Sequence, residues 1–340
     1  MEAVRNGHSP LGIVLRILAA GIVVLAAIAV RDVFDDSPPR DTDGSRVLEF
    51  TIDSELLGRE MPVKIVIPPG ARDGRRSLLV FLHGRGEDEK SYLVEPMFEA
   101  LAKQGGKAPV VAFPEGGPDS YWHDRDDGEW GSYVLDEVIP EVAARFEIEP
   151  ERIAIGGISM GGFGALDIAT LDPARFCAVG GHSPAVWENA GDTASGAFDG
   201  DDDFARHDVF TELGPPADPL EGKRVWLDVG DDDPFADTVA DLRDVLEEGG
   251  AKVRLYEGEG EHESAYWNSN WDRYMQFYAR ALKKCQVDTP AVHGHEGKDK
   301  NEGGKAKDAA GGKDDKSAGG TAPAAGAGDG KAESAGDGSP

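Results

Sequence analysis

Short apolar runs alternate with amphipathic stretches through the middle of the chain. Five stretches show the spacing of helices, at 92–103, 131–146, 160–171, 236–248 and 265–284. Eight apolar runs predict strands, at 47–52, 63–67, 78–83, 109–114, 152–157, 177–182, 225–230 and 252–257. The later runs are apolar at consecutive positions, which is typical of strands buried on both faces of a parallel sheet. This alternation predicts an α/β fold, a mostly parallel central sheet with helices on both faces. No helical pattern separates the first two runs, so we expect an antiparallel pair at that edge.

The N-terminal segment, residues 1–31, contains a long apolar stretch. Residues 11–30 read LGIVLRILAAGIVVLAAIAV, and only Arg16 interrupts them. About 20 apolar residues can span a bilayer as a helix, and the shorter run after Arg16 has the size of a signal-peptide core. The segment therefore predicts a cleaved signal or an uncleaved membrane anchor, and we slightly favour the anchor. Because arginines precede this core and aspartates follow it, we expect the rest of the chain to be extracytoplasmic.

Composition divides the remaining chain into three parts. Residues 32–46 are polar, contain two prolines and predict a linker. Residues 47–286 carry the alternating pattern and predict one folded domain. Residues 287–340 are rich in Gly, Ala, Lys and Asp and lack large apolar side chains, so they cannot bury enough surface to order themselves. We expect this tail to be disordered.

Charge and cysteine content restrict the partners. The formal net charge is −29, with 64 acidic residues against 35 lysines and arginines. Such an acidic surface repels nucleic acid and anionic headgroups, so we expect membrane contact only through the N-terminal segment. Cys177 and Cys285 are too few for a disulfide framework and lack the spacing of a zinc site. The simplest interpretation is two separate thiols, although an exported chain could carry a single bridge.

The most informative motif is a glycine-rich stretch around one serine. Residues 152–166 read RIAIGGISMGGFGAL, and Gly157 to Gly161 fit the pattern G-x-S-x-G. A buried strand is predicted directly before this motif and a helix directly after it. That context is typical of a sharp strand-to-helix turn that exposes the serine hydroxyl, here that of Ser159. A serine that only caps the helix is the simple alternative, and a phosphate-binding loop is disfavoured because G-x-x-x-x-G-K-[ST] is absent.

A serine nucleophile needs a base, and the base needs a carboxylate that orients it. On this kind of fold the chain order is Ser, acid, His. Of eight histidines, only His262, His293 and His295 follow any plausible acid, and the last two lie in the tail. We therefore predict His262 as the base. The acid should follow the strand at 225–230, where Asp231, Asp232 and Asp233 are consecutive, and sequence physics alone does not separate them.

An acyl-transfer site also needs two backbone N–H donors for the oxyanion. The amide of Met160, directly after the serine and at a helix N-terminus, is the first candidate. The second should come from the loop GRGEDEKS that follows the strand at 78–83.

These features together resemble the α/β-hydrolase fold, in particular the esterase branch of S-formylglutathione hydrolases, feruloyl-esterase-like enzymes and antigen 85 mycolyltransferases. The resemblance covers about residues 47–282. It is carried by LHGRG, SYWHDRDDGEWGSYVLDEVIP, GGISMGGFGAL, VGDDDPF and GEHESAYW.

The resemblance implies roles for further residues. The branch places its acid in a G-x-x-D-x-F pattern, which selects Asp233 with Asp232 second, and its second oxyanion amide belongs to the residue after His-Gly, which is Arg85. His83 would then support the loop. We place Tyr121, Trp122 and Trp267 at the substrate cleft and assign Trp271 to the core. FDGDDDF at 198–204 lies where lids are inserted, but without the pattern of a calcium loop we expect it to be a solvated loop.

We therefore predict a serine hydrolase of carboxylic esters that uses Ser159, Asp233 and His262 and needs no cofactor or metal. Its substrate would be a small-molecule or cell-surface ester. Two alternatives stay open: an acyltransferase of the mycolyltransferase type, and a non-catalytic binding protein on a hydrolase fold.

Overall fold

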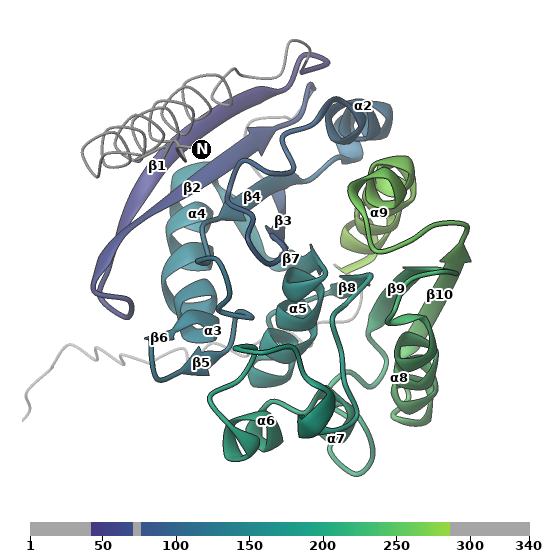
Figure 1. Cartoon of the computed structure of the whole chain (residues 1–340). Helices are drawn as coiled ribbons and strands as arrows, with labels where there is room; N and C mark the ends of the chain where they lie inside the picture. The colour runs from purple at the N-terminus through teal and green to yellow at the C-terminus, as the bar shows by residue number, and fades with distance from the viewer. Residues whose placement is uncertain (1–41, 71–75, 286–340) are drawn as a thin grey trace, which may run out of the picture. The chain divides into compact units, whose positions relative to one another are not determined.

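The computed structural model describes residues 42–70 and 76–285, in which eight strands form one sheet (Figure 1). Its strand order is β1-β2-β4-β3-β7-β8-β9-β10. All eight predicted runs are strands of this sheet: β1 (Arg46–Ser54), β2 (Arg59–Ile67), β3 (Arg76–Leu82), β4 (Val110–Pro114), β7 (Ile148–Ile158), β8 (Ala178–His182), β9 (Arg224–Gly230) and β10 (Lys252–Gly258). Beside the sheet, β5 (Asp124–Arg125) and β6 (Gly128–Glu129) form a small ribbon.

The sheet is mostly parallel, as predicted. β2 pairs antiparallel with β1 and with β4, whereas the pairs from β4 through β3, β7, β8 and β9 to β10 are all parallel. The expected antiparallel edge is therefore confirmed. The carboxyl ends of the parallel strands meet at one edge of the sheet, which is where open α/β sheets carry their ligand sites.

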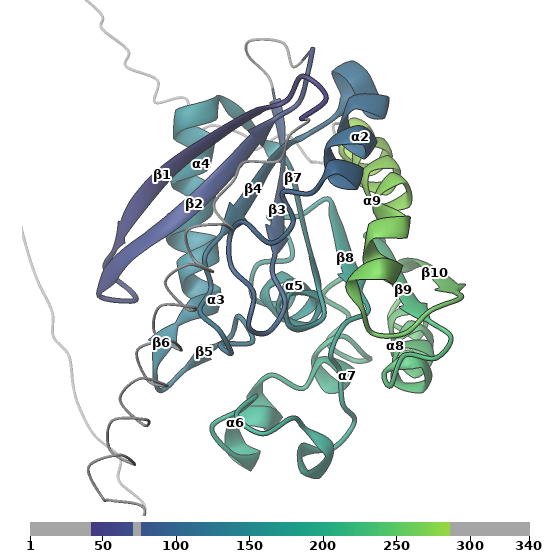
Figure 2. The same ribbon diagram turned by 45° about the horizontal axis from the view of Figure 1, so that its top comes forward.

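Helices cover both faces of the sheet (Figures 1 and 2). In β3, Leu78 and Val80 point into one core and Leu79 and Phe81 into the other, as expected for a strand buried on both sides. The first core packs against α4 (Ile139–Phe146), α5 (Met160–Leu171) and α8 (Ala236–Glu248), and the second against α2 (Glu95–Gln104) and α9 (Ser264–Lys284). A 3-10 turn, η1 (Gly105–Lys107), follows α2.

Two regions differ from the expected helices. The helix predicted at 131–146 is divided into α3 (Trp130–Ser132), a π-helical stretch η2 (Tyr133–Val138) and α4. The π-helical stretch gives way to α4 next to Pro140, which lies in the first turn of α4. Proline has no N–H to donate to an earlier carbonyl. Between β8 and β9 the chain forms three short elements that sequence periodicity did not predict, η3 (Ala190–Asp192), α6 (Asp201–Arg206) and α7 (Val209–Glu212).

A disulfide joins Cys177 to Cys285, with 5.7 Å between their Cα atoms. Cys177 directly precedes β8, and Cys285 directly follows α9, which crosses the sheet back to the start of β8. The interpretation as two separate thiols is thus wrong, because it considered each cysteine only in its local segment.

The predictions for residues 1–31, for most of the linker and for the tail lie outside the described residues. Within 42–70 and 76–285, no helix is both long enough and apolar enough to cross a membrane.

Candidate active site

The predicted site residues lie at the carboxyl edge of the sheet, although they are far apart in sequence. Ser159 follows β7 directly, Asp233 follows β9 and His262 follows β10. Arg85 follows β3, which is the neighbour of β7. Parallel strand order therefore explains why these four loops meet.

Ser159 occupies a strained turn between β7 and α5. Its φ is 55° and its ψ is −115°, a backbone conformation that non-glycine residues rarely adopt. The turn is held by hydrogen bonds on both sides: the amide of Ser159 donates to the carbonyl of His182 at 2.9 Å, and its carbonyl accepts from the amide of Ala185 at 3.1 Å. The side chain is half-buried at the surface.

Two glycines of the motif are required by close backbone contacts. A Cβ on Gly157 would lie 2.4 Å from the backbone of Gly161, and a Cβ on Gly161 would lie 2.2 Å from the carbonyl oxygen of Leu82. Any side chain at either position would therefore push the turn away from the end of β3. The contact with Leu82 also places the serine turn against the loop that contains Arg85.

The hydroxyl of Ser159, the ring of His262 and one carboxylate form a continuous chain. Ser159 Oγ lies 2.8 Å from His262 Nε2, and His262 Nδ1 lies 2.8 Å from Asp233 Oδ2. The carboxylate of Asp233 is fully buried, and its other oxygen accepts from the amide of Phe235 at 2.9 Å. Because an ionised carboxylate only accepts, this chain assigns the ring proton to Nδ1 and leaves Nε2 to accept from the serine hydroxyl.

The three consecutive aspartates have different places. Asp233 contacts the imidazole, whereas Asp231 accepts from the amide of Gly260 at 2.9 Å and so fastens the loop that precedes His262. The side chain of Asp232 is exposed. The choice of Asp233 over Asp232 agrees with this geometry.

Comparison with known proteins adds the family. Residues 54–277 match the sequence model of a family described as "Putative esterase". The chain belongs to this esterase family. It is 28% identical over 214 residues to the S-formylglutathione hydrolase of Paracoccus denitrificans, a match that covers 54% of this chain and 74% of that enzyme. The match to the mouse S-formylglutathione hydrolase, at 26% identity, spans only 55% of that enzyme.

Solved structures share the fold. A ferulic acid esterase superimposes with a TM-score of 0.61 at 19% identity, covering 70% of this chain and 99% of the esterase. The S-formylglutathione hydrolase of Agrobacterium tumefaciens gives a TM-score of 0.60 at 21% identity, covering 70% of this chain and 96% of the enzyme. The fold is therefore that of the α/β-hydrolase esterases.

The loop after β3 is built around His83 and Gly84. His83 is buried, its Nδ1 lies 2.9 Å from the carbonyl of Gly84, and its Nε2 accepts from the amide of Gly116 at 3.0 Å. Burial lowers the pKa of His83, which keeps the ring neutral and suits this donor-and-acceptor pair. His83 thus supports the loop, as expected. The amide of Glu87 donates to the carbonyl of Gly84 at 3.2 Å and so closes a four-residue turn. Arg85 is the second residue of this turn, and the hydrogen bond that closes the turn does not involve the amide of Arg85.

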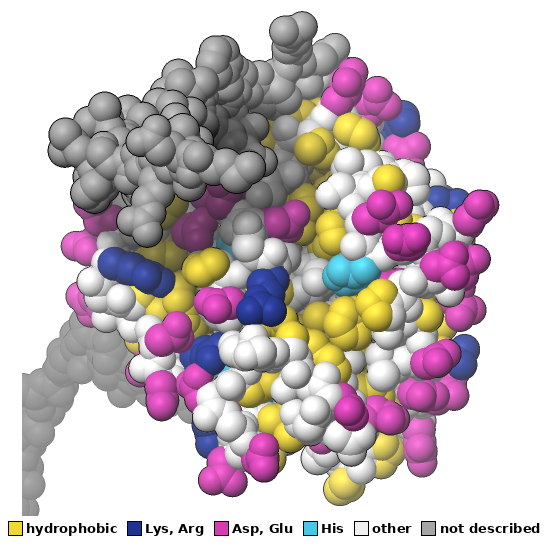
Figure 3. Space-filling view, in the orientation of Figure 1, with side chains coloured by type: hydrophobic (Ala, Val, Ile, Leu, Met, Phe, Trp, Pro, Cys, Tyr) yellow, Lys and Arg dark blue, Asp and Glu magenta, His cyan; other side chains and the backbone are white. Residues whose placement is uncertain are grey.

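Aromatic rings extend from His262 across the carboxyl edge. Those of Phe235 and Trp187 are half-buried, whereas Tyr121, which was expected at the cleft, is buried with only 3% of it exposed. The ring of Trp267 lies 5.2 Å from that of His262, and the ring of Phe235 lies 5.3 Å from it. Trp187 then follows at 5.5 Å from Phe235, and Tyr121 at 5.8 Å from Trp187. Figure 3 shows apolar side chains gathered in the middle of this view, with acidic side chains around its margin. The sequence did not reveal Trp187 as a site residue, and it did not predict that Phe235 contacts His262. Both contacts depend on how the chain folds between β8 and α8.

Trp122 was expected at the cleft, and this expectation is wrong. Its side chain is fully buried, its Nε1 donates to the carbonyl of His83 at 3.1 Å, and it fills the space left open by Gly116 and Gly164. It therefore supports the loop of Arg85 from below. Trp267, 9% exposed, does border His262, and Trp271 is a core residue, as expected.

A buried polar network lies beneath the serine turn. His182, whose carbonyl receives the amide of Ser159, has Nδ1 at 2.6 Å from Asp228 Oδ1 and Nε2 at 2.8 Å from the hydroxyl of Tyr278. Asp228 also accepts from Tyr274 at 2.7 Å and from Trp226 at 3.0 Å. The network joins β8 and β9 to α9 and fixes the strand end that holds Ser159. Its members come from three distant elements, so no local pattern could reveal it.

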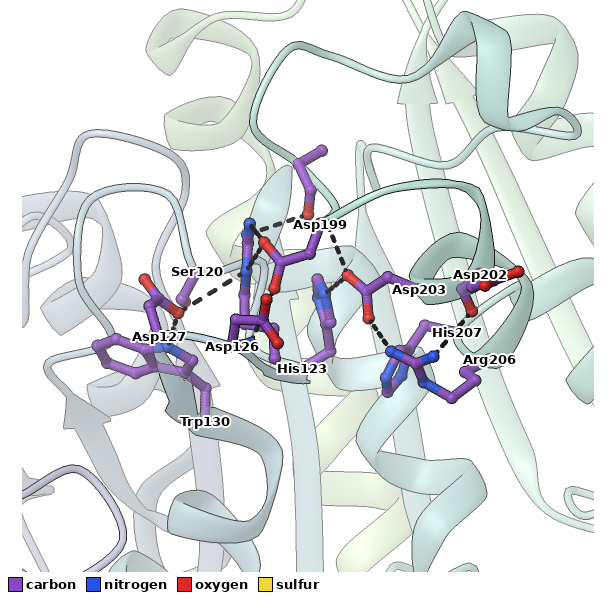
Figure 4. Close-up of polar contacts among 12 residues, drawn as sticks. Ser120, His123, Asp126, Asp127, Trp130, Asp199, Asp202, Asp203, Arg206 and His207 are labelled. Carbon is purple, nitrogen blue, oxygen red and sulfur yellow. Dashed lines mark hydrogen bonds and ion pairs between the residues drawn. The ribbon is translucent and has the colours of Figure 1, made fainter.

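A second buried cluster corrects the expectation for residues 198–204. Asp203 is buried, with Oδ2 3.1 Å from His123 Nε2 and Oδ1 2.9 Å from Arg206, and Figure 4 shows it between the two. Asp199, in turn, pairs with Arg125. The segment is not a solvated loop, because two of its acids anchor it to the chain around His123.

Charge is distributed unequally in this cluster. Burial and the charge of His207 lower the pKa of His123. Burial alone would also lower the pKa of His207, but the hydrogen bond from His207 Nδ1 to Asp167 at 2.9 Å and the charge of Asp167 outweigh burial and raise that pKa. His207 is therefore the ring that takes the proton first. Because Asp167 lies on α5, the pair ties the α6 region to the helix that directly follows Ser159.

Proposed function

We propose that this member of the esterase family hydrolyses carboxylic esters through an acyl-enzyme on Ser159, with His262 as proton shuttle and Asp233 as its orienting acid. The observation that carries the proposal is the chain of two 2.8 Å contacts from Ser159 Oγ through His262 to a fully buried carboxylate. A solvated loop histidine would have neither contact.

The geometry supports a two-step reaction. In the first step Ser159 Oγ bonds to the ester carbonyl carbon as its proton passes to His262 Nε2, and the imidazolium then protonates the departing alcohol. In the second step water attacks the acyl-enzyme, giving its proton to Nε2, and the acid leaves as Oγ recovers a proton. Asp233 accepts from Nδ1 throughout and stabilises the imidazolium. No cofactor or metal takes part.

The amides of Met160 and Arg85 would bind the oxyanion. Met160 is the first residue of α5, where backbone N–H groups have no partner within the helix and the helix dipole favours negative charge. Arg85 lies in the turn that meets the serine turn near Leu82. Loss of one such donor typically costs about 3 kcal/mol of transition-state stabilisation.

The surroundings of His262 favour uncharged esters with apolar or aryl acyl groups. The half-buried rings of Phe235 and Trp187 follow one another from His262, and Trp267 also borders His262. Such rings can make apolar contacts with the acyl group of the ester and do not restrict that group to one chain length. The net charge of −29 would disfavour anionic substrates.

Turnover of p-nitrophenyl esters from acetate to decanoate, together with methyl esters of aromatic acids, tests the proposal. We expect Ser159→Ala to abolish turnover on the whole panel while the circular dichroism spectrum stays unchanged. Full turnover by Ser159→Ala would refute the acyl-enzyme. Addition of a sugar or alcohol acceptor separates hydrolysis from acyl transfer, because hydrolysis alone rejects the acyltransferase alternative.

We also propose that the hydrolase domain acts outside the cytoplasm, held by its N-terminal segment. The apolar run at 11–30 and its flanking charges support this location, and so does the Cys177–Cys285 disulfide, since such bridges persist in oxidising compartments. Protein isolated from producing cells should sediment with membranes and retain its N-terminus. A soluble product cleaved near residue 29 would instead show a signal peptide.

A further inference from the structure

A basic groove lies between α9 and the edge strand β10, in a chain whose net charge is −29. The groove is a cavity of about 300 Å³. Its cationic lining consists of Arg224, Arg254, Arg273, Arg280 and Lys284, and no acid lines it. This concentration of positive charge is the opposite of what the overall composition predicts.

The fold explains why this face of β10 is open. Val253 and Leu255 point toward the core under α8, so Arg254 and Tyr256 point to the other face. On that face α9 packs mainly over β7, β8 and β9, and its Arg273 reaches across to the ring of Tyr256 on the edge strand. In so acidic a chain the space left between α9 and the edge strand would normally be lined by acidic side chains, but it is lined by arginines.

Two of the four guanidinium groups of the groove lie over aromatic rings. Arg254 sits 5.1 Å from the ring centre of Trp226, and Arg273 sits 4.2 Å from that of Tyr256. Arg273 also donates to Asn270 at 2.7 Å. Among the described residues, no carboxylate comes within ion-pair distance of any of the five cations. The charges of Arg254 and Arg273 are thus held in place by the rings, and no ion pair among the described residues neutralises any of the five cations.

A second cavity of about 490 Å³ continues the basic surface toward the start of the strands and shares Arg224. Lys223 and Lys252 line it, together with two acids, Glu151 and Glu221. Lys223 is half-buried, and this burial lowers its pKa, as expected for a cation whose nearby charges do not compensate for lost water. The basic side chains of the two cavities therefore form one continuous row, which is longer than a single small anion such as phosphate.

We propose that this basic groove binds a linear, phosphate-bearing polyanion other than nucleic acid, such as a polyphosphate or a phosphorylated polymer. Arginine favours phosphate because its planar fork donates two parallel hydrogen bonds. Bases of a nucleic acid would need free rings to stack on, but guanidinium groups already cover Trp226 and Tyr256. Membrane insertion is disfavoured, since the one large hydrophobic side chain that is exposed in the described part of the chain is Leu171, on α5.

The groove is separate from the candidate active site. Arg224 and Lys252 are the first residues of β9 and β10, whereas Asp233 and His262 follow the carboxyl ends of the same strands. Binding in the groove should therefore leave ester turnover unchanged, and the proposal does not rest on the proposed function.

Titration of the full chain with tripolyphosphate by isothermal calorimetry, at constant ionic strength set with sodium chloride, tests this site. We expect saturable binding at one site per chain. Arg224→Gln combined with Arg280→Gln should weaken it by at least about tenfold, because each charged hydrogen-bond donor lost typically costs that much. The matched control, Lys107→Gln with Arg145→Gln, removes the same charge outside the groove and should bind as the wild type does.

Three results would overturn the proposal. They are absence of saturable binding, equal weakening in both double variants, and binding to phosphatidylglycerol vesicles or a single-stranded oligonucleotide but not to tripolyphosphate. In the first case the arginines serve only to cover the two rings and to protect the edge strand from pairing. Thermal denaturation of both variants shows whether they are folded.

Discussion

Of three consecutive aspartates, only Asp233 directs its carboxylate at His262, with Oδ2 at 2.8 Å from Nδ1. Asp231 holds the amide of Gly260, and Asp232 is exposed. The three side chains are chemically identical, so their different surroundings provide an internal control for the role of a buried acid.

Asp233→Asn should lower kcat/KM for p-nitrophenyl butyrate by about 1,000- to 10,000-fold, because the amide no longer holds the ring with its proton on Nδ1. Asp232→Asn, the matched control, should stay within about twofold of the wild type, as is usual for exposed side chains. Steady-state kinetics of both variants check this. Equal losses in the two would remove Asp233 from the proposed triad.

Close packing between β8 and α9 predicts a destabilised variant. A Cβ on Gly180 would lie 1.9 Å from the hydroxyl of Tyr278. Gly180→Ala should therefore lower the free energy of unfolding by about 1–3 kcal/mol, the usual cost of overpacking. Gly191→Ala, where the added Cβ meets open space, should change it by less than about 0.5 kcal/mol. Urea denaturation measures both, and a Gly180→Ala protein as stable as wild type would show that this contact is not as tight as described.

The His207–Asp167 pair predicts a pH-dependent contribution to stability. The folded pKa of His207 is raised, so its stabilisation is fully present below the unfolded value of about 6.5 and is lost as pH rises through the folded pKa. His207→Gln should therefore lower Tm more at pH 6 than at pH 9. A Tm difference that is constant between these pH values would show that His207 acts only by packing.

The disulfide predicts a stability effect without an activity effect. It closes a sequence separation of 108 residues, so Cys177→Ser with Cys285→Ser should lower the free energy of unfolding by about 2–5 kcal/mol. Ester turnover at 25 °C should be unchanged, since the bridge lies at the start of β8, away from Ser159. Dithiothreitol should lower the Tm of the wild type alone. Two thiols titrating in the unreduced, denatured protein would contradict the bridge.

Much of the fold could be predicted because local sequence patterns determine its strands and the turn at Ser159. Apolar runs marked all eight strands, and the glycines around Ser159 marked the turn, since backbone contacts such as Gly161 with Leu82 permit no side chain. Chain order then brought His262 and Asp233 to the same edge.

What could not be predicted depends on contacts between distant segments. Nothing local places β4 between β2 and β3, or Trp122 beneath the loop of Arg85. The acidic composition of residues 198–204 predicts a solvated loop, and the contact between Asp203 and His123 depends on a segment about 80 residues earlier in the chain. Cys177 likewise lies next to Cys285 only because α9 crosses the sheet and ends beside the start of β8.

Labelling with a fluorophosphonate probe, followed by peptide mass spectrometry, tests the acyl-enzyme most directly. We predict one adduct per chain, on Ser159, with loss of ester turnover in proportion to labelling and no adduct in Ser159→Ala. A folded wild-type protein that stays unlabelled, or that is labelled elsewhere while turnover persists, would contradict the assignment of Ser159 as the nucleophile.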